Sequence, residues 1–250
     1  MPYGMYISAE GAQAQAQRLE VIANNLANVE TPGYKRDVPT FQARFAEAIQ
    51  QGAALEGDGS IHDVGGGVKI VETQTDFSRS SLRHTKIDTD FAIQGDGFFQ
   101  LLADDGQTLL TRAGNFFVDP NGQLLSRTER LPVLDEGGAP IQLNADQPWQ
   151  LVSGGIIEQQ GSQTALGLVA PESLGDLVKA GQNAFRSLGP VSPVAERDVR
   201  QGYLEQSGVN PTRETMPMIE TSRAFEANMK LVQHQDSMIS GLIHRVLGQS

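Results

Sequence analysis

The chain has 250 residues, an ordinary hydrophobic fraction of 39% and no cysteine, which excludes disulfides and thiolate chemistry. Its formal charge of −11 argues against a nucleic-acid partner and against an anionic membrane surface. Residues 1–41 and 203–250 each carry a net charge of −1, which leaves −9 on the middle of the chain. No apolar run is long enough to span a bilayer, so we expect no membrane insertion. The first residues lack the pattern of a secretory signal, which predicts a cytoplasmic protein or one exported without a cleaved signal peptide.

Residues 1–41 predict a helix that ends in an abrupt turn. The predicted helix carries a seam of apolar residues at alternating steps of four and three: Met5, Ala9, Ala12, Ala16, Leu19, Ala23 and Leu26. Most of these are alanine, which permits close approach but buries little area, so the helix needs a partner. Asn24, Asn25 and Asn28 lie close together at the end of this seam. One interpretation is that they are helix-end residues with no further role.

A turn and a connection follow the first helix. Pro32 disfavours a helical conformation at Thr31, and the pair Pro32-Gly33 suits the two central positions of a type II turn. Residues 42–67 are rich in glycine and predict a flexible connection.

Residues 68–202 predict a β-rich domain. Short apolar runs alternate there with turn signals such as Asp105-Gly106 and Asn121-Gly122. The stretches FFQLL-ADDGQ-TLLTR and NFFV-DPNG-QLLS each predict a hairpin. Repeated short strands of this kind are typical of an antiparallel all-β domain.

Residues 203–250 predict a long C-terminal helix. Its apolar seam consists of residues that recur every seven positions, with others beside them: Met218, Phe225, Val232, Ile239 and Val246, then Met229, Leu242 and Ile243. Asn210-Pro211 offers a cap and a first helical residue, but Pro217 would then fall inside the helix. We therefore expect the helix to begin near Thr215.

The predicted fold class is α+β, with N- and C-terminal helices that pair as a coiled-coil-like core and a central antiparallel all-β domain. Periodicity alone leaves open whether the two helices pair within one molecule or between molecules.

Candidate chemical sites are few. Asp88, Asp90 and Asp96 lie in DTDFAIQGDG, but the spacing is not that of a calcium loop. The four histidines fall in no metal-ligand pattern, and no nucleophile elbow, phosphate loop or dinucleotide fingerprint is present. We expect no metal, no cofactor and no catalytic residues.

Four stretches, in order, resemble the bacterial flagellar axial proteins, the family of rod, hook and hook-associated subunits. They are LEVIANNLANVETPGYKRD, then DTDFAIQGDGFFQL with LLTRAGNFFVDPNGQLLS, then GYLEQSGVNP, and finally MIETSRAFEANMKLVQHQDSM. The length of 250 is similar to that of the medium-sized basal-body rod proteins. The C-terminal tail resembles the proximal-rod type more than the distal-rod type, which usually has Tyr where Phe225 stands.

The resemblance implies a structural subunit of the flagellar rod, the drive shaft that transmits torque from motor to hook. It implies homo- and hetero-assembly with other rod subunits and export by the flagellar export apparatus. The expected assembly interface consists of Leu19, Ile22, Asn24, Asn25, Leu26, Asn28, Met218, Phe225, Met229, Val232 and Ile239. Because a slipped pairing would leave an amide unsatisfied, the three asparagines are expected to fix the neighbour and the offset. The alternatives are a distal-rod subunit, a soluble ligand- or metal-binding β-protein, and an enzyme.

Overall fold

The computed structural model describes residues 3–43, 67–144, 147–195 and 197–247. The chain divides into two compact units. Unit 1 comprises the described residues within 1–27, 37–76 and 209–250, and unit 2 comprises those within 28–36 and 77–208. Each unit is built from segments that are far apart in the sequence.

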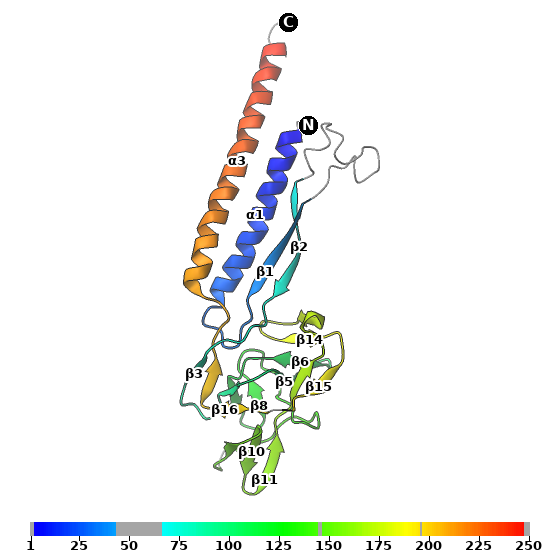
Figure 1. Ribbon diagram of the computed structural model, residues 1–250, viewed down its shortest axis with the longest axis vertical. Helices are drawn as coiled ribbons and strands as arrows, with labels where there is room; N and C mark the ends of the chain where they lie inside the picture. The colour runs from blue at the N-terminus through cyan, green and yellow to red at the C-terminus, as the bar shows by residue number, and fades with distance from the viewer. Residues whose placement is uncertain (1–2, 44–66, 145–146, 196, 248–250) are drawn as a thin grey trace. The chain divides into compact units, whose positions relative to one another are not determined.

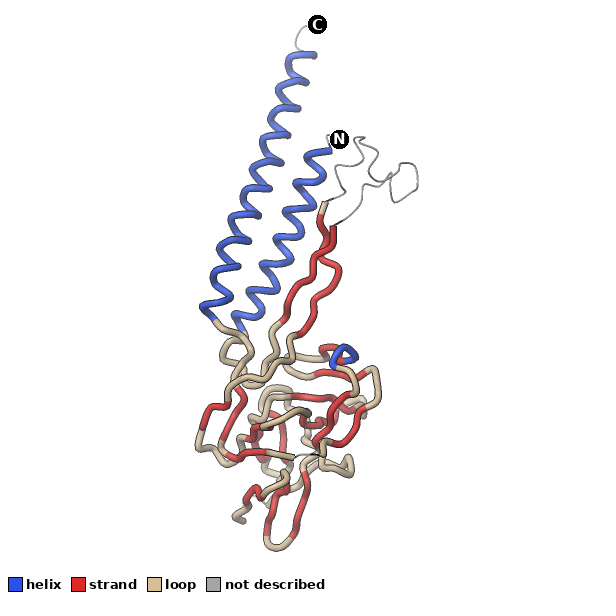
Figure 2. The backbone as a smooth tube through the Cα atoms, in the orientation of Figure 1, coloured by secondary structure: helices blue, strands red, loops and turns tan. Residues whose placement is uncertain are grey.

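Unit 1 contains two helices and a pair of strands (Figures 1 and 2). The helices α1 (Tyr3–Ala27) and α3 (Pro211–Leu247) lie side by side and run in opposite directions. The strands β1 (Asp37–Ala43) and β2 (Val68–Thr75) pair antiparallel with an irregularity between Thr40 and Phe41, and both contact α1. The helices therefore pair within one molecule, which was one of the two arrangements left open by the sequence.

The expected start of the C-terminal helix near Thr215 is wrong, because α3 begins at Pro211. The Asn210 side-chain Oδ1 accepts hydrogen bonds from the backbone N–H groups of Thr212 and Arg213, at 3.0 Å and 3.2 Å. This cap satisfies two of the otherwise unpaired N–H groups, and Pro211 at the first helical position loses nothing. Pro217 consequently lies inside the helix.

Unit 2 is made of short strands and one 3₁₀ turn, η2 (Leu174–Asp176). In chain order the strands are β3 (Leu82–His84), β4 (Phe91–Ile93), β5 (Phe98–Leu102), β6 (Thr108–Thr111), β7 (Phe116–Val118), β8 (Leu124–Ser126), β9 (Gln150–Val152), β10 (Ile156–Gln159), β11 (Ser162–Ala165), β12 (Leu168–Pro171), β13 (Leu177–Lys179), β14 (Phe185–Ser187), β15 (Val191–Pro193), β16 (Val199–Gln201) and β17 (Tyr203–Glu205).

All strand pairs of unit 2 are antiparallel. Its largest sheet has six strands in the order β13-β14-β6-β5-β12-β15, and a smaller sheet has the order β11-β10-β9. Three two-stranded pairs join β16 to β4, β17 to β3 and β7 to β8. The two predicted hairpins are confirmed as β5–β6 and β7–β8. The predicted α+β class, with paired terminal helices and a central antiparallel domain, is confirmed.

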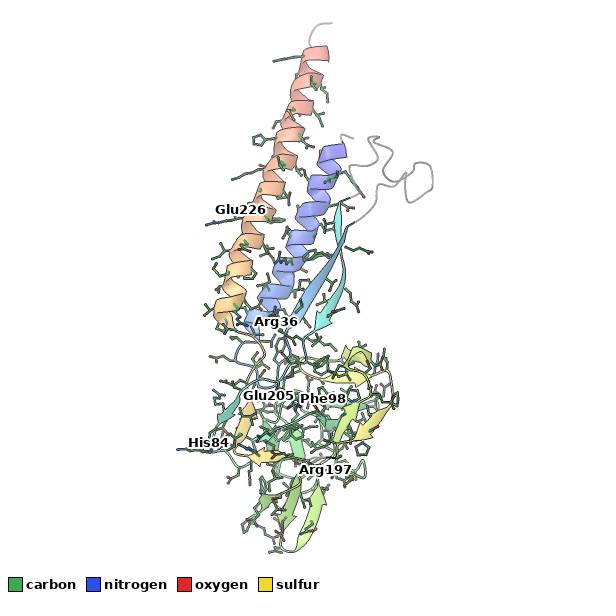
Figure 3. All side chains as sticks on the ribbon, in the orientation of Figure 1. Arg36, His84, Phe98, Arg197, Glu205 and Glu226 are labelled. Carbon is green, nitrogen blue, oxygen red and sulfur yellow. The ribbon has the colours of Figure 1, made fainter. Side chains whose placement is uncertain are left out.

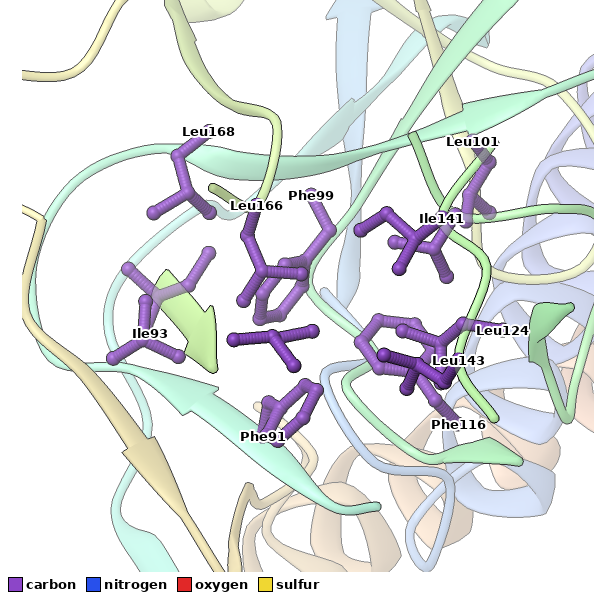
Figure 4. Close-up of a cluster of buried hydrophobic side chains, with 13 residues drawn as sticks. Phe91, Ile93, Phe99, Leu101, Phe116, Leu124, Ile141, Leu143, Leu166 and Leu168 are labelled. Atoms are coloured by element: carbon purple, nitrogen blue, oxygen red, sulfur yellow. The ribbon is translucent and has the colours of Figure 1, made fainter. Parts of the chain in front are cut away.

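Phenylalanine, leucine and isoleucine side chains fill the core of unit 2 (Figure 4). Phe99 and Phe116 meet edge to face with ring centroids 5.2 Å apart, and Phe91 lies 5.8 Å from Phe116. A second cluster packs Phe98 and Phe185 against the half-buried Phe77. Aromatic rings bury large areas, so unit 2 has the core of an independently folded domain.

The two units divide the chain differently from the expected segments. Strand β2 belongs to unit 1 with the helices, whereas the sequence placed residues 68–75 at the start of the β-rich domain. Residues 28–36, expected to form the turn that belongs with the first helix, belong to unit 2. Most of the expected connection 42–67 lies outside the described residues.

Candidate assembly interface

The expected interface residues of α3 line the side of the helix that is partly covered. Met218, Phe225, Val232 and Ile239 are all half-buried, whereas Met229 is 39% exposed. Their seven-residue spacing keeps the first four on one face, and that face is partly covered within the subunit. Glu226 projects from α3 into solvent (Figure 3).

The expected interface residues of α1 are distributed over more than one side of the helix. Ile22 is buried at 4% exposure, and Leu19 and Leu26 are half-buried. Two members of the predicted alanine seam, Ala9 and Ala23, are exposed. The predicted seam is therefore not wholly covered within the subunit.

The glycines of α1 approach α3 more closely than the predicted seam suggests. A Cβ atom built on Gly4 would lie 2.9 Å from Gln235 Nε2, and one built on Gly11 would lie 3.2 Å from Asn228 Nδ2. These glycines precede Met5 and Ala12 of the predicted seam by one position each.

The asparagines at the end of α1 occupy three different environments. Asn24 is exposed, whereas Asn25 is 1% exposed. The Asn25 Nδ2 group donates to the Asp37 carbonyl at 2.8 Å, and its Oδ1 accepts from the Asp37 N–H at 2.9 Å. Asn25 thus ties the last turn of α1 to the first residue of β1. Asn28 Oδ1 accepts from the Thr31 hydroxyl at 3.1 Å.

The turn after α1 is held by backbone hydrogen bonds within unit 2. The Tyr34 N–H donates to the Thr31 carbonyl at 3.3 Å, with Pro32 and Gly33 between them. Gly33 has a φ of 67°, which glycine adopts without the cost that a side chain would add. A Cβ atom at Gly33 would lie 2.5 Å from the carbonyl carbon of Arg112, so only glycine fits this position.

A buried charge cluster lies beside this turn, and nothing in the sequence indicated it. The Lys35 ammonium donates to Glu205 Oε1 at 2.7 Å and to the Ser78 carbonyl at 2.8 Å. Lys35 and Glu205 are only 1% and 3% exposed, and Glu205 is labelled in Figure 3. Arg112 Nη1 lies 3.8 Å from Glu205 Oε2, and this side chain is 4% exposed.

Arg112 supplies a second buried cation to this cluster. Burial lowers the pKa of the Arg112 guanidinium, while the Glu205 carboxylate acts in the opposite direction. Arg112 Nη2 donates to the Gly95 carbonyl at 2.6 Å, and the guanidinium lies 5.4 Å above the Phe98 ring. One carboxylate therefore faces two cations inside unit 2.

Large apolar side chains remain exposed on α3. Of sixteen such side chains in the described residues, seven lie on this helix: Met216, Ile219, Met229, Leu231, Met238, Leu242 and Ile243. Scattered single exposures are ordinary, but a concentration on one helix indicates a surface that another molecule covers.

The aspartates weighed as metal ligands have other surroundings. Asp96 pairs with Arg79 at 2.8 Å, and Asp90 is 3% exposed. The described part of the chain places no three His, Cys, Asp or Glu side chains where they could hold a metal ion. None of its helices combines the length and apolarity that crossing a membrane requires.

Three family models match successive parts of the chain. A flagella basal body rod protein model matches residues 5–35, and a flagellar hook protein FlgE/F/G D1 domain model matches residues 92–164. The C-terminal model of the flagellar basal body rod FlgEFG proteins matches residues 200–243.

Whole-chain relatives decide the family. The chain is 32% identical to the flagellar basal-body rod protein FlgG of Buchnera aphidicola subsp. Schizaphis graminum, over 95% of this chain and 97% of that protein. The chain belongs to the flagellar basal-body rod FlgF/FlgG family. It is 31% identical to FlgF of Mesorhizobium japonicum over 95% of both chains, and 29% identical to FlgF of Caulobacter vibrioides over 98% of both. The protein is therefore a structural subunit of the flagellar basal-body rod and not an enzyme. Relatives of both types match at similar identity, which leaves the preference for the proximal-rod type a prediction.

Proposed function

We propose that this subunit builds the proximal part of the rod, the FlgF type, and joins homologous rod subunits through exposed apolar side chains of its two helices. The preference for the proximal part rests on the resemblance of the C-terminal tail. The interface proposal rests on one observation, the concentration of exposed apolar side chains on α3. In this role the rod transmits torque from the motor to the hook.

The end of α3 carries the strongest part of this argument. Gly4, near the start of α1, faces Gln235, whereas α3 continues to Leu247. Those twelve further residues span roughly 18 Å at the standard rise. Among them, Met238, Leu242 and Ile243 are 61%, 62% and 51% exposed. Burying two such side chains in a neighbour contributes about 3–5 kcal/mol, which is enough to decide whether a subunit is incorporated.

Of the three expected interface asparagines, this proposal keeps only Asn24 in the interface itself. Asn24 is exposed, so we keep it in the proposed interface with the half-buried Leu19 and Leu26. Asn25 and Asn28 bond within their own chain. Their role in assembly would be to shape the end of α1 that a neighbour meets.

The interface is tested by placing a charge on the end of α3. Leu242→Asp would force a carboxylate into an apolar contact, which is costly when it has no partner. We expect purified basal bodies to contain less than about a tenth of the wild-type amount of this variant. Ser240→Asp is the matched control, because it adds the same charge at an exposed polar position on the same end of α3. Incorporation of both variants at the wild-type amount would remove α3 from the interface.

The position in the rod is tested separately by labelling. Because the chain has no cysteine, Asp104→Cys in the exposed β5–β6 turn provides a single thiol for a gold label. Electron microscopy of purified basal bodies should then show gold near the motor end of the rod. Gold near the hook end would assign the subunit to the distal rod instead.

Export is the remaining part of the proposal. The family assignment suggests that the flagellar export apparatus delivers the subunit without cleavage of a signal peptide. The subunit from purified basal bodies should therefore retain its encoded N-terminus, apart from the initiator methionine. A shortened N-terminus in the mass spectrum would refute this route.

A further inference from the structure

Apolar and polar residues alternate along the face of α3 that contains the apolar seam. The apolar positions are Met218, Phe225, Val232 and Ile239, and the polar positions that alternate with them, also seven residues apart, are Glu214, Thr221, Asn228 and Gln235. Asn228 and Gln235 are half-buried, and Glu214 and Thr221 are only 4% and 1% exposed. A stripe of this kind on a covered helix face demands an explanation, because leucine at the same places would bury more apolar area.

Opposite two of these polar residues, α1 has glycine. Gly4 faces Gln235 and Gly11 faces Asn228. The two glycines are seven residues apart on α1, and the two amides are seven residues apart on α3. Glycine within a helix costs about 1 kcal/mol relative to alanine, so its presence indicates a local requirement. A methyl group at either position would meet the end of the facing amide side chain, so the amide would have to shift from the place it has in the structure.

The same steps of seven along the antiparallel helices set Arg18 level with Thr221 and Asn25 level with Glu214. Both of these α1 side chains contact β1, because the Arg18 guanidinium lies 5.7 Å from the centre of the Phe41 ring and Asn25 bonds to Asp37. The contacts of glycine with an amide are therefore those of Gly4 and Gly11. A slip of seven residues that brings Gly4 level with Leu242 would instead set Arg18 level with Asn228.

The polar stripe does not maximise the strength of the pairing. Among the described residues, Thr221 Oγ1 and Gln235 Oε1 are buried without a hydrogen-bond partner, as is Gln15 Oε1 on α1. Each such atom costs about 1–3 kcal/mol of stability. Polar residues at heptad positions are known to trade stability for a unique register.

We propose that Asn228, seated over Gly11, selects the antiparallel register of α1 and α3. A slip by one heptad would move α3 along α1 by roughly 10 Å. The register therefore fixes how much of the end of α3 extends beyond α1. That consequence rests on the proposed function, in which this end binds a neighbour, but the register itself is a property of the single subunit.

Disulfide trapping in the full-length free subunit measures the register directly, because the chain has no cysteine of its own. Gly4→Cys with Gln235→Cys joins two positions that meet in the structure. Gly4→Cys with Leu242→Cys joins positions that meet only after a slip of seven residues. With the rest of the stripe intact, the native pair should be oxidised by copper–phenanthroline at least about tenfold faster than the slipped pair.

Removing the amide should abolish this preference. In an Asn228→Leu or Asn228→Ala background, we expect the two rates to come within about threefold of each other. Gln233→Leu is the matched control, because it replaces an exposed amide on the same helix and should keep the tenfold preference. Circular dichroism verifies that each variant keeps its helices.

Two results would overturn the inference. One is an unchanged preference for the native pair in both Asn228 variants. The other is equal rates of the two pairs when the stripe is intact, which would also be the result if the helices did not pair in the free subunit. Neither result depends on whether the subunit enters the rod, so failure of the register inference is distinguishable from failure of the proposed function.

Discussion

The buried charge cluster of unit 2 predicts an asymmetric response to mutation. Glu205 faces two buried cations, with Lys35 Nζ at 2.7 Å and Arg112 Nη1 at 3.8 Å. Its Oε1 also accepts from the Ser80 N–H at 3.1 Å. Glu205→Gln keeps the shape of the side chain but removes the negative charge that faces the two buried cations. It should therefore lower the free energy of unfolding of unit 2 by about 3–5 kcal/mol.

Replacing Lys35 should be less harmful. Lys35→Met leaves Glu205 with Arg112 and with the Ser80 N–H, so the remaining charge still has partners. The lost hydrogen bonds and ion pair should then cost about 1–3 kcal/mol. The double variant Lys35→Met/Glu205→Gln should lose less stability than the sum of the two single losses, because Lys35 and Glu205 are partners of one another.

Urea unfolding followed by fluorescence measures these effects in unit 2. Trp149 is the only tryptophan, and its ring lies 5.9 Å from Phe91 in the core of that unit. A loss of about 4 kcal/mol should lower the urea midpoint by roughly 2 M. Glu136→Gln is the control, because the Glu136 carboxylate is 54% exposed, and its midpoint should fall much less than that of Glu205→Gln. A Glu205→Gln midpoint equal to that of the wild type, or a larger loss in Lys35→Met, would refute the reasoning.

Three further changes test separate features. Gly33→Ala should destabilise unit 2 by at least about 2 kcal/mol in the same assay, because its φ is positive and the methyl group meets backbone atoms. Pro217→Ala should stabilise α3 by about 1–3 kcal/mol in thermal melts followed by circular dichroism, whereas Pro211→Ala should be nearly neutral. The Arg197 guanidinium holds the pKa of the Glu136 carboxyl below its ordinary value, so Arg197→Ala should raise it in an NMR titration. Since the folded-state pKa is the lower one, this pair contributes to stability above the ordinary carboxyl pKa and loses that contribution as the pH falls through the folded value.

Local signals in the sequence were sufficient for the hairpins of unit 2. Asp105-Gly106 and Asn121-Gly122 mark the two turns, and Gly106 and Gly122 have φ values of 79° and 86°. In the first turn Asp105 accepts a hydrogen bond from the Gln107 N–H group, and in the second Asp119 accepts one from the Asn121 N–H group. Interactions among residues two to four positions apart can be predicted from sequence because no distant segment is needed to form them.

The helix face of α1 was harder to predict. Alanine is compatible with either a covered or an exposed position, so the seam through Ala9 and Ala23 carried little information. The glycines that approach α3 most closely have no side chain, and apolar periodicity does not reveal them. The polar residues of α3 between the apolar heptad positions were missed for the same reason, because an apolar pattern indicates contact only where the contact is apolar.

The buried cluster was beyond the reach of sequence patterns. Lys35 and Glu205 are 170 positions apart, and each belongs to a residue type that is normally exposed. The stretch that resembles the family did contain Lys35, but similarity alone gave it no structural role. The strand pair β1–β2 was missed in part because its two strands are separated by 24 residues.

The two units bury their apolar residues in different ways, and this difference supports our proposal that unit 1 carries the assembly interface. Unit 2 encloses Phe91, Phe99 and Phe116 within its own fold and leaves five large apolar side chains exposed among its described residues. The helix α3 alone leaves seven exposed, and its partner α1 meets it in part through glycine and amides. A molecule that binds only the folded helices stabilises them by mass action, whereas a domain with a closed core has no such dependence. Neighbouring subunits should therefore stabilise α1 and α3 far more than unit 2, which is the behaviour expected when the terminal helices, and not the β-rich unit, hold a rod together.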